Sequence, residues 1–252
     1  MKLHFTKIPG PEKYNFLILH GLFGSGKNWT TVGNALKSYG NVWLIDARNH
    51  GDSPHTDTHT LNDMTEDLRD FMLDHEIENP VIIGHSMGGL TAMNYALKHQ
   101  PAMPIVIVDI FPVDLNFAHE NELASLQLDV GNAASRGEID QKMQEFVADK
   151  FIRQFLQMNL EKTPGGYRWK INTKALLDRK NMFKGYFSGD ISYNGEILFV
   201  MGEKSPYYRR QDEEQTRRIF PNARIEVIPD GTHYLHYANF EAFLRIVTGF
   251  LK

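Results

Sequence analysis

Six short runs of aliphatic, β-branched and aromatic residues recur along the chain, and turn-forming residues end each of them. These runs are Phe16–Leu19, Val42–Ile45, Val81–Ile83, Ile105–Val108, Ile197–Val200 and Ile225–Ile228. Helical patterns such as Leu61–Leu73 and Met87–His99 lie between them. Strands that are apolar throughout are buried on both faces, and their alternation with helices is typical of a parallel sheet. The sequence therefore predicts an α/β protein with a mostly parallel central sheet flanked by helices.

One long interval, from residue 111 to 193, interrupts this alternation. It contains no strong strand pattern, and its periodicity predicts amphipathic helices at Leu123–Leu128, Met143–Met158 and Thr173–Phe183. An insertion of this length exceeds a simple crossover between two strands. We expect residues 1–110 and 194–252 to form the core. Residues 111–193 are expected to form a helical cap, or lid, inserted after the strand that ends at Asp109.

The composition excludes several classes of protein. The 252 residues include 27 Lys and Arg against 31 Asp and Glu, and the net charge of −4 argues against nucleic acid or an anionic membrane as a partner. The absence of cysteine excludes disulfides and thiolate chemistry, and it fits a reducing compartment. There is no signal-peptide core and no run of about 18 apolar residues. We therefore expect a cytoplasmic protein that does not insert into a membrane.

The predicted strand Val81–Ile83 runs directly into the sequence G-H-S-M-G at residues 84–88, and a helical pattern follows at once. This context of strand, G-x-S-x-G turn and helix is the one that the nucleophile-elbow motif requires. The turn presents the Ser86 hydroxyl at the end of the sheet, beside the free N–H groups of the helix. Glycine is needed at 84 and 88 because a Cβ there would collide with neighbouring backbone. Ser86 is therefore the candidate nucleophile.

His233 is the candidate general base. It follows the last predicted strand at the carboxyl edge of the sheet, which is also the edge that carries Ser86. His236, three residues later, is its nearest competitor. His55 and His59 are spaced like a pair of metal ligands, but their polar loop favours exposed side chains without a metal.

A rival motif lies in the loop after the first predicted strand. Residues 21–27, G-L-F-G-S-G-K, satisfy the G-x-x-x-x-G-K pattern of a phosphate-binding loop. Asn28 follows the lysine, so the hydroxyl that would reach Mg²⁺ is missing. A nucleotide site would also leave Ser86 and His233 without a purpose. We therefore regard nucleotide binding as the less favoured interpretation.

Four segments together resemble the α/β-hydrolase superfamily over nearly the whole chain. They are the elbow, His20-Gly21, the D-x-R-x-x-G-x-S sequence at 46–53, and Gly231-Thr232-His233. Within the superfamily the sequence is most similar to small cytosolic esterases of the YbfF type, which share the H-G-L-F-G-S and D-x-R-N-H-G sequences and a helical cap. The resemblance implies the α/β-hydrolase fold, a nucleophile–acid–histidine order and no metal or organic cofactor. It also implies an oxyanion hole formed by the backbone N–H groups of Leu22 and Met87.

The acid departs from the pattern of this family. The common acid is an aspartate about three residues after the glycine that ends the next-to-last strand, and Ser205 stands there in this chain. Two other acids follow strands, Asp109 and Glu203. Asp109 is favoured because its carboxylate is expected at the edge that faces the cap, and Glu203 is the alternative. Asp230 is too close to the histidine in the same turn.

These residues predict a serine hydrolase that cleaves short-to-medium acyl esters or thioesters through an acyl-enzyme. Aromatic residues could line an acyl pocket, although packing is the commoner role for such residues: Phe111, Phe117, Phe151, Phe155, Tyr167, Trp169 and Phe187. Cationic residues could meet an anionic leaving group such as coenzyme A, although solvated faces are favoured: Arg136, Lys150, Arg153, Arg168 and Lys170. The alternatives are a carbon–carbon bond hydrolase or acyltransferase on the same triad, and an inactive ligand-binding member of the fold.

Overall fold

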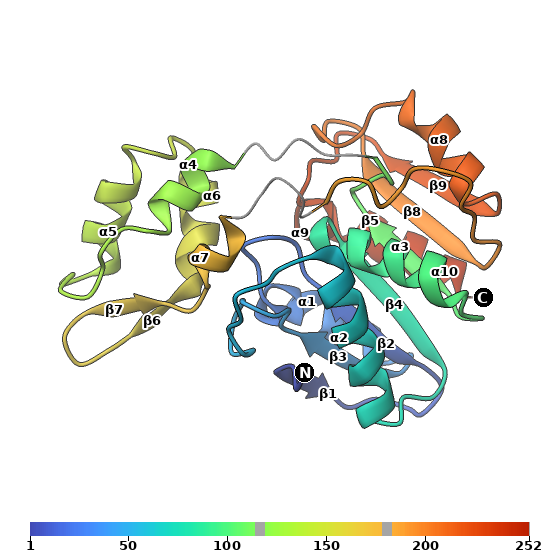
Figure 1. The fold of residues 1–252 in the computed structure, drawn as a ribbon, viewed down its shortest axis with the longest axis horizontal. Helices are drawn as coiled ribbons and strands as arrows, with labels where there is room; N and C mark the ends of the chain where they lie inside the picture. Colours follow the sequence, from blue (N-terminus) through green and yellow to red (C-terminus); the bar gives the residue numbers. More distant parts are fainter. Residues whose placement is uncertain (114–118, 178–182, 252) are drawn as a thin grey trace.

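The computed structural model describes residues 1–113, 119–177 and 183–251. A seven-stranded sheet with the order β1-β3-β2-β4-β5-β8-β9 forms its centre (Figure 1). The strands are β1 (Phe5–Ile8), β2 (Asn15–Leu19), β3 (Asn41–Ile45), β4 (Pro80–His85), β5 (Ile105–Val108), β8 (Ile197–Gly202) and β9 (Ala223–Ile228). β1 runs antiparallel to β3, and the other neighbouring pairs are parallel. The predicted mostly parallel sheet is confirmed, and β1 is an edge strand that the sequence patterns did not indicate.

Helices cover both faces of this sheet because side chains alternate along each strand. On one face, Phe16 and Ile18 pack with η1 (Gly26–Trp29), α1 (Thr30–Leu36) and α10 (Phe240–Phe250). On the other face, Leu17 and Leu19 pack with α2 (Leu61–Asp74), α3 (Met87–His99) and α8 (Asp212–Ile219). The predicted helices at Leu61–Leu73 and Met87–His99 are confirmed. Among the described residues, no helix is long and apolar enough to cross a membrane.

The elements between residues 119 and 177 lie together on the left of Figure 1, apart from the helices that cover the sheet. They are α4 (Glu120–Ser125), α5 (Arg136–Met143), α6 (Lys150–Leu156), η2 (Gln157–Asn159), α7 (Thr173–Leu176) and the antiparallel hairpin β6 (Leu160–Lys162) and β7 (Tyr167–Trp169). A single helix over Met143–Met158 is wrong. The side chain of Asp149 caps a new helix there by accepting the N–H groups of Phe151 and Ile152. The hairpin was not predicted either.

The other two predicted helices of this segment differ from the structure at their ends. The helix predicted at Leu123–Leu128 begins and ends earlier, as α4. The helix predicted at Thr173–Phe183 is present as the single turn α7, and residues 178–182 of that prediction lie outside the described residues. The short helix α9 (Leu235–Ala238) follows β9 near the end of the chain.

Candidate active site

Ser86 lies in a strained turn between β4 and α3. Its φ of 50° and ψ of −113° fall in a region that residues other than glycine rarely adopt. The turn closes tightly because two glycines flank the serine. A Cβ at Gly84 would lie 2.3 Å from the Gly88 carbonyl oxygen, and a Cβ at Gly88 would lie 2.3 Å from the Leu19 carbonyl oxygen. The local sequence therefore forces the sharp strand-to-helix turn that presents Ser86 at the end of the sheet.

His233 lies in the loop after β9, and its Nδ1 is 2.7 Å from Oδ2 of Asp109. Asp109 follows β5 and is fully buried. Its Oδ1 accepts the Gly202 N–H at 2.7 Å, and its Oδ2 also accepts the Ser205 hydroxyl. These donors neutralise the cost of burying the carboxylate and fix its orientation toward the imidazole.

Glu203, the alternative acid, does not contact His233. It is exposed, and its Oε2 accepts the backbone N–H of Asp230 at 3.0 Å. Asp230 is itself exposed and forms an ion pair with Lys204. Of the three acids near this edge of the sheet, the structure therefore brings Asp109 to the histidine. His236 is not the histidine that pairs with Asp109, because its ring stacks on Trp29 with the ring centroids 4.1 Å apart.

Ser86 and His233 line the same cavity, which has a volume of about 190 Å³. Leu22 and Phe23 contribute one part of the wall, and Tyr207 and Tyr234 contribute another. The side chains of Ile152, Phe155 and Leu156 come from α6 and make one wall apolar. The cavity therefore places the serine and the histidine between the sheet edge and the segment predicted to be a cap.

Two backbone N–H groups beside Ser86 are suited to bind an oxyanion. Met87 is the first residue of α3, where N–H groups have no partner within the helix, and Leu22 lies on the cavity wall. The recorded hydrogen bonds of the described residues include none donated by either N–H. The neighbouring N–H of Phe23 already donates to Nε2 of His50 at 3.3 Å. The assignment of Leu22 and Met87 to an oxyanion hole stays a prediction.

Buried neutral histidines hold the loops around this site. Burial, and then the charge of His233, keeps the pKa of His85 well below its ordinary value. The imidazole of His85 is therefore neutral. Its Nε2–H donates to the carbonyl oxygen of His233, 2.9 Å away. Burial also lowers the pKa of His20, whose Nδ1–H donates to the Gly21 carbonyl oxygen while Nε2 accepts the Ala47 N–H.

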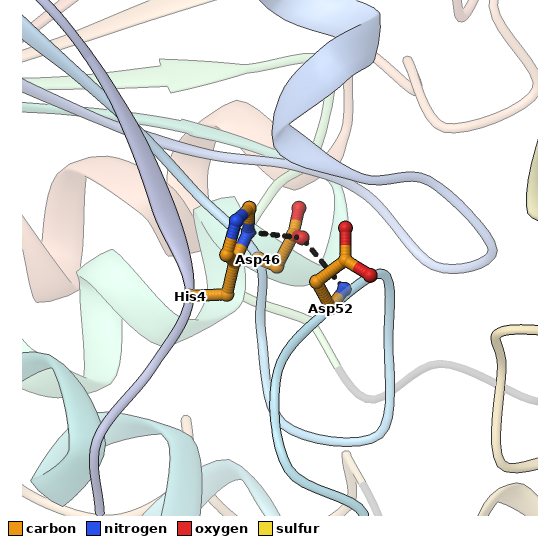
Figure 2. Close-up of side chains that lie close together, drawn as sticks. All are labelled: His4, Asp46 and Asp52. Carbon is orange, nitrogen blue, oxygen red and sulfur yellow. Dashed lines mark hydrogen bonds and ion pairs between the residues drawn. The ribbon is translucent and has the colours of Figure 1, made fainter.

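Asp46 supports the same loop from the turn at residues 46–53. Its Oδ1 accepts the Gly26 N–H at 2.7 Å, and its Oδ2 accepts from His4 Nδ1 and the Asp52 N–H, both at 2.9 Å (Figure 2). Gly51 has a φ of +56°, and a Cβ there would lie 2.2 Å from Oδ2 of Asp46. The D-x-R-x-x-G-x-S sequence therefore builds a turn around one carboxylate. Three hydrogen bonds, from His4, Gly26 and Asp52, hold that carboxylate in place.

The phosphate-binding interpretation of residues 21–27 does not fit this geometry. The Gly26 N–H, which would cradle a phosphate, already donates to the Asp46 carboxylate. The Ser25 N–H donates to Oδ1 of Asn28, and a short 3-10 helix follows instead of an α-helix. An anionic side chain thus occupies the position that this motif would offer to a nucleotide.

His55 and His59 each contact a different part of the chain. Nε2 of His55 lies against the carbonyl oxygen of Lys170, while Nε2 of His59 lies 3.3 Å from the Met87 sulfur. The expectation that both side chains are exposed is wrong for His59. It is buried, and burial lowers its pKa to about 3. Its ring lies against that of His50, with the ring centroids 5.2 Å apart.

Most residues proposed for substrate contacts have other roles. Of the predicted aromatic residues that are described, Phe155 lines the cavity with Ser86, while Phe111 and Phe187 are buried in the core. Phe117 lies outside the described residues. None of the five cations lines this cavity. The guanidinium of Arg153 binds Asp140, Arg168 pairs with Glu161, and Lys170 pairs with Asp52.

A polar cluster that was not predicted from the sequence also lines this cavity. His119 and Glu122 come from the start of α4, and Tyr207 comes from the loop after β8. Nε2 of His119 is 3.1 Å from the Tyr207 hydroxyl, and its Nδ1 is 3.7 Å from Oε1 of Glu122. The i, i+3 spacing of His119 and Glu122 was visible in the sequence, but nothing there connected it with Tyr207.

This fold and this site define an α/β hydrolase. The family model for the α/β-hydrolase fold matches residues 14–240, and the chain belongs to this family. It is 36% identical over 248 residues to sn-1-specific diacylglycerol lipase ABHD11 of Danio rerio, covering 94% of this chain and 78% of the relative. It is 29% identical over 258 residues to esterase YbfF of Escherichia coli (strain K12), covering both chains fully. A solved marine microorganism esterase superposes with a TM-score of 0.93 at 36% identity, covering 99% of each chain.

Proposed function

We propose that this protein hydrolyses carboxylic esters through an acyl-enzyme formed on Ser86, with His233 as general base and Asp109 as the acid of the triad. The observation that carries the proposal is the shared cavity of Ser86 and His233, combined with the bond from His233 Nδ1 to a buried carboxylate. That bond leaves Nε2 as the nitrogen that exchanges a proton with the serine. The esterase and lipase names of the relatives support the same chemistry.

In the first half of the reaction, Nε2 of His233 takes the Ser86 proton as Oγ attacks the ester carbonyl carbon. Asp109 holds the ring and stabilises the imidazolium that forms. The tetrahedral oxyanion accepts hydrogen bonds from the N–H groups of Leu22 and Met87, each worth about 3 kcal/mol. The imidazolium then protonates the leaving alcohol as the carbon–oxygen bond breaks. Water hydrolyses the acyl-enzyme by the same steps.

We assign residues 111–193 the role of a cap that shapes the substrate site. The apolar side chains of Ile152, Phe155 and Leu156 favour a short-to-medium acyl chain along α6. A coenzyme A thioester is less favoured, because no Lys or Arg is among the described residues that line this cavity. The substrate class is therefore an ester of a small alcohol rather than of a polyanion.

A fluorophosphonate probe tests the proposal directly. Peptide mapping by mass spectrometry should find the label on Ser86, and hydrolysis of p-nitrophenyl esters from acetate to laurate should be lost in Ser86→Ala. Ser25→Ala, a serine outside this cavity, is the matched control and should keep both the label and the turnover. A folded protein with neither label nor turnover would refute the proposal and favour the ligand-binding alternative.

A further inference from the structure

Leu22, whose N–H group is assigned to the proposed oxyanion hole, is the first of the two central residues of a tight turn. The turn is closed by a hydrogen bond from the Gly24 N–H to the Gly21 carbonyl oxygen at 3.0 Å. Its second central residue, Phe23, has a φ of 64°, a left-handed conformation that residues other than glycine rarely adopt. A positive φ at this position is typical of type II turns, which favour glycine there. The turn is therefore stabilised by contacts that hold Phe23 in this conformation.

Two buried side chains bind the backbone of Phe23 from different parts of the chain. The Phe23 N–H donates to Nε2 of His50, in the turn at residues 46–53, at 3.3 Å. The Phe23 carbonyl oxygen accepts a hydrogen bond from Nδ2 of Asn159 at 2.8 Å. Asn159 lies in η2, in the segment between β5 and β8. Both side chains are buried, so both bonds form away from water, where a donor or acceptor without a partner is costly.

The protonation state of His50 makes its Nε2 an acceptor. Burial, and then the charge of His20, keeps the pKa of His50 well below its ordinary value, so the ring is neutral. Its Nδ1–H donates to the carbonyl oxygen of Arg48 at 3.0 Å, and this bond leaves Nε2 without a proton. His50 therefore accepts the Phe23 N–H and holds one end of that residue against the turn at 46–53.

Asn159 is itself held in place within its own segment. Its Nδ2 donates a second hydrogen bond, to the Leu156 carbonyl oxygen at 3.1 Å. The guanidinium of Arg136 donates to the carbonyl oxygens of Gln157 and Leu160, at 2.6 and 3.0 Å. The amide of Asn159 therefore uses both of its hydrogens, and the backbone on either side of this residue is fixed.

The conformation of Phe23 determines the direction of the Leu22 N–H through the turn. The Gly21 carbonyl oxygen accepts the Gly24 N–H and, at 2.8 Å, Nδ1–H of His20. The Gly21 carbonyl and the Leu22 N–H belong to one planar trans peptide unit, so they point in opposite directions. The closed turn that fixes the carbonyl therefore fixes the N–H as well. A change of φ at Phe23 would open the turn and release this N–H.

We propose that Asn159 is a positioning residue for the oxyanion hole. By holding Phe23 in the left-handed conformation, it directs the Leu22 N–H into the cavity that contains Ser86. The segment between β5 and β8 then contributes to the chemical step as well as to the shape of the substrate site. This inference rests on the proposed function of Ser86. Because the oxyanion forms only after the serine attacks, the effect of Asn159 falls on kcat and not on substrate binding.

A matched ester and thionoester isolate this effect, namely p-nitrophenyl butyrate and its analogue with sulfur in place of the carbonyl oxygen. The tetrahedral intermediate of the thionoester carries its charge on sulfur, which is a weaker hydrogen-bond acceptor than oxygen. The ratio of the two kcat/KM values therefore reports the hydrogen bonds to the oxyanion. Asn159→Leu removes the donor to Phe23 at a similar side-chain size. We expect it to lower kcat for the ester roughly tenfold with KM little changed, and to lower the ester-to-thionoester ratio roughly fivefold.

Gln157→Met is the matched control. Gln157 lies in the same short helix, but its side-chain amide donates to Asp140 within the segment, at 2.9 Å. This substitution should leave the ratio unchanged. Asn159→Ala removes the same donor as Asn159→Leu with a smaller side chain, so it provides the test if the leucine variant does not fold.

Both substrates are measured on one preparation of each variant, so a loss of folded protein lowers both rates equally and leaves the ratio unchanged. An unchanged ratio in Asn159→Leu and Asn159→Ala, with hydrolysis still abolished by Ser86→Ala, would overturn the positioning role and leave the proposed function standing. A ratio that Gln157→Met lowers to the same extent would also overturn it, because any disturbance of η2 would then have this effect. Hydrolysis that survives Ser86→Ala would instead overturn the proposed function.

Discussion

His236 makes the stability of the fold sensitive to acid. The side chain is buried, stacks on Trp29 at an interplanar angle of 6°, and has no hydrogen-bond partner for Nδ1. Burial, and then the charge of His233, lowers its pKa from 6.5 to about 3. Below pH 6.5 the unfolded chain therefore binds a proton that the folded chain does not bind, so the free energy of unfolding falls as the pH falls.

The size of this effect follows from the shift. Each pH unit between the two pKa values is worth about 1.4 kcal/mol, so His236 alone should reduce the free energy of unfolding by about 2 kcal/mol between pH 7 and pH 5. His236→Phe keeps an aromatic ring against Trp29 but removes the titrating group. The loss of stability between pH 7 and pH 5 should therefore be about 2 kcal/mol smaller in this variant than in the unmodified protein.

Urea unfolding at pH 7 and pH 5, followed by tryptophan fluorescence or circular dichroism, measures this difference. His55→Gln is the matched control, because His55 is an exposed histidine, and it should lose as much stability as the unmodified protein. If His236→Phe loses the same free energy between the two pH values as the unmodified protein does, the buried neutral state of His236 is not the source of acid sensitivity.

Four further substitutions test the site and the turn that carries it. Asp109→Asn should lower kcat for p-nitrophenyl butyrate by about 10⁴-fold, because the amide favours the wrong tautomer of His233, and Glu203→Gln should leave kcat unchanged if Asp109 is the acid. Ser205→Ala removes one donor to the Asp109 carboxylate and should lower kcat about tenfold, with the labelling of Ser86 retained. Gly84→Ala places a Cβ 2.3 Å from a backbone oxygen and should cost about 3 kcal/mol or more, measured as a fall in Tm; an unchanged Tm would contradict the tight-turn argument.

The central strands could be predicted because they are apolar on both faces. β4, β5 and β8 are buried along nearly their whole length, so their sequences have few polar interruptions. β1 was not predicted because it lies at the edge of the sheet, where the Thr6 and Lys7 side chains are exposed and interrupt the apolar pattern. The break between α5 and α6 was not predicted because a periodic apolar pattern continues across it. A single capping residue, Asp149, starts the new helix.

The candidate site likewise contains residues that the sequence could identify and residues that it could not. Ser86 and His233 stand in short motifs whose local sequence dictates the local backbone, so each could be singled out from its neighbours. The choice between Asp109 and Glu203 depends on which side chain turns toward the histidine, and the sequence does not contain that information. The polar cluster could not be predicted for a similar reason. His119 and Tyr207 are 88 residues apart in the sequence, and only the fold brings them together.

The pairing of β5 with β8 explains how a carboxylate that follows β5 can reach His233. The two strands are neighbours, and the Asp109 N–H donates to the carbonyl oxygen of Val200. Both strands therefore end at the same edge of the sheet, beside His233. A carboxylate that follows either strand can therefore reach the imidazole. Ser205, at the position where the family commonly has its aspartate, donates a hydrogen bond to the Asp109 carboxylate. Asp109 and Ser205 therefore lie together beside His233, although they follow different strands.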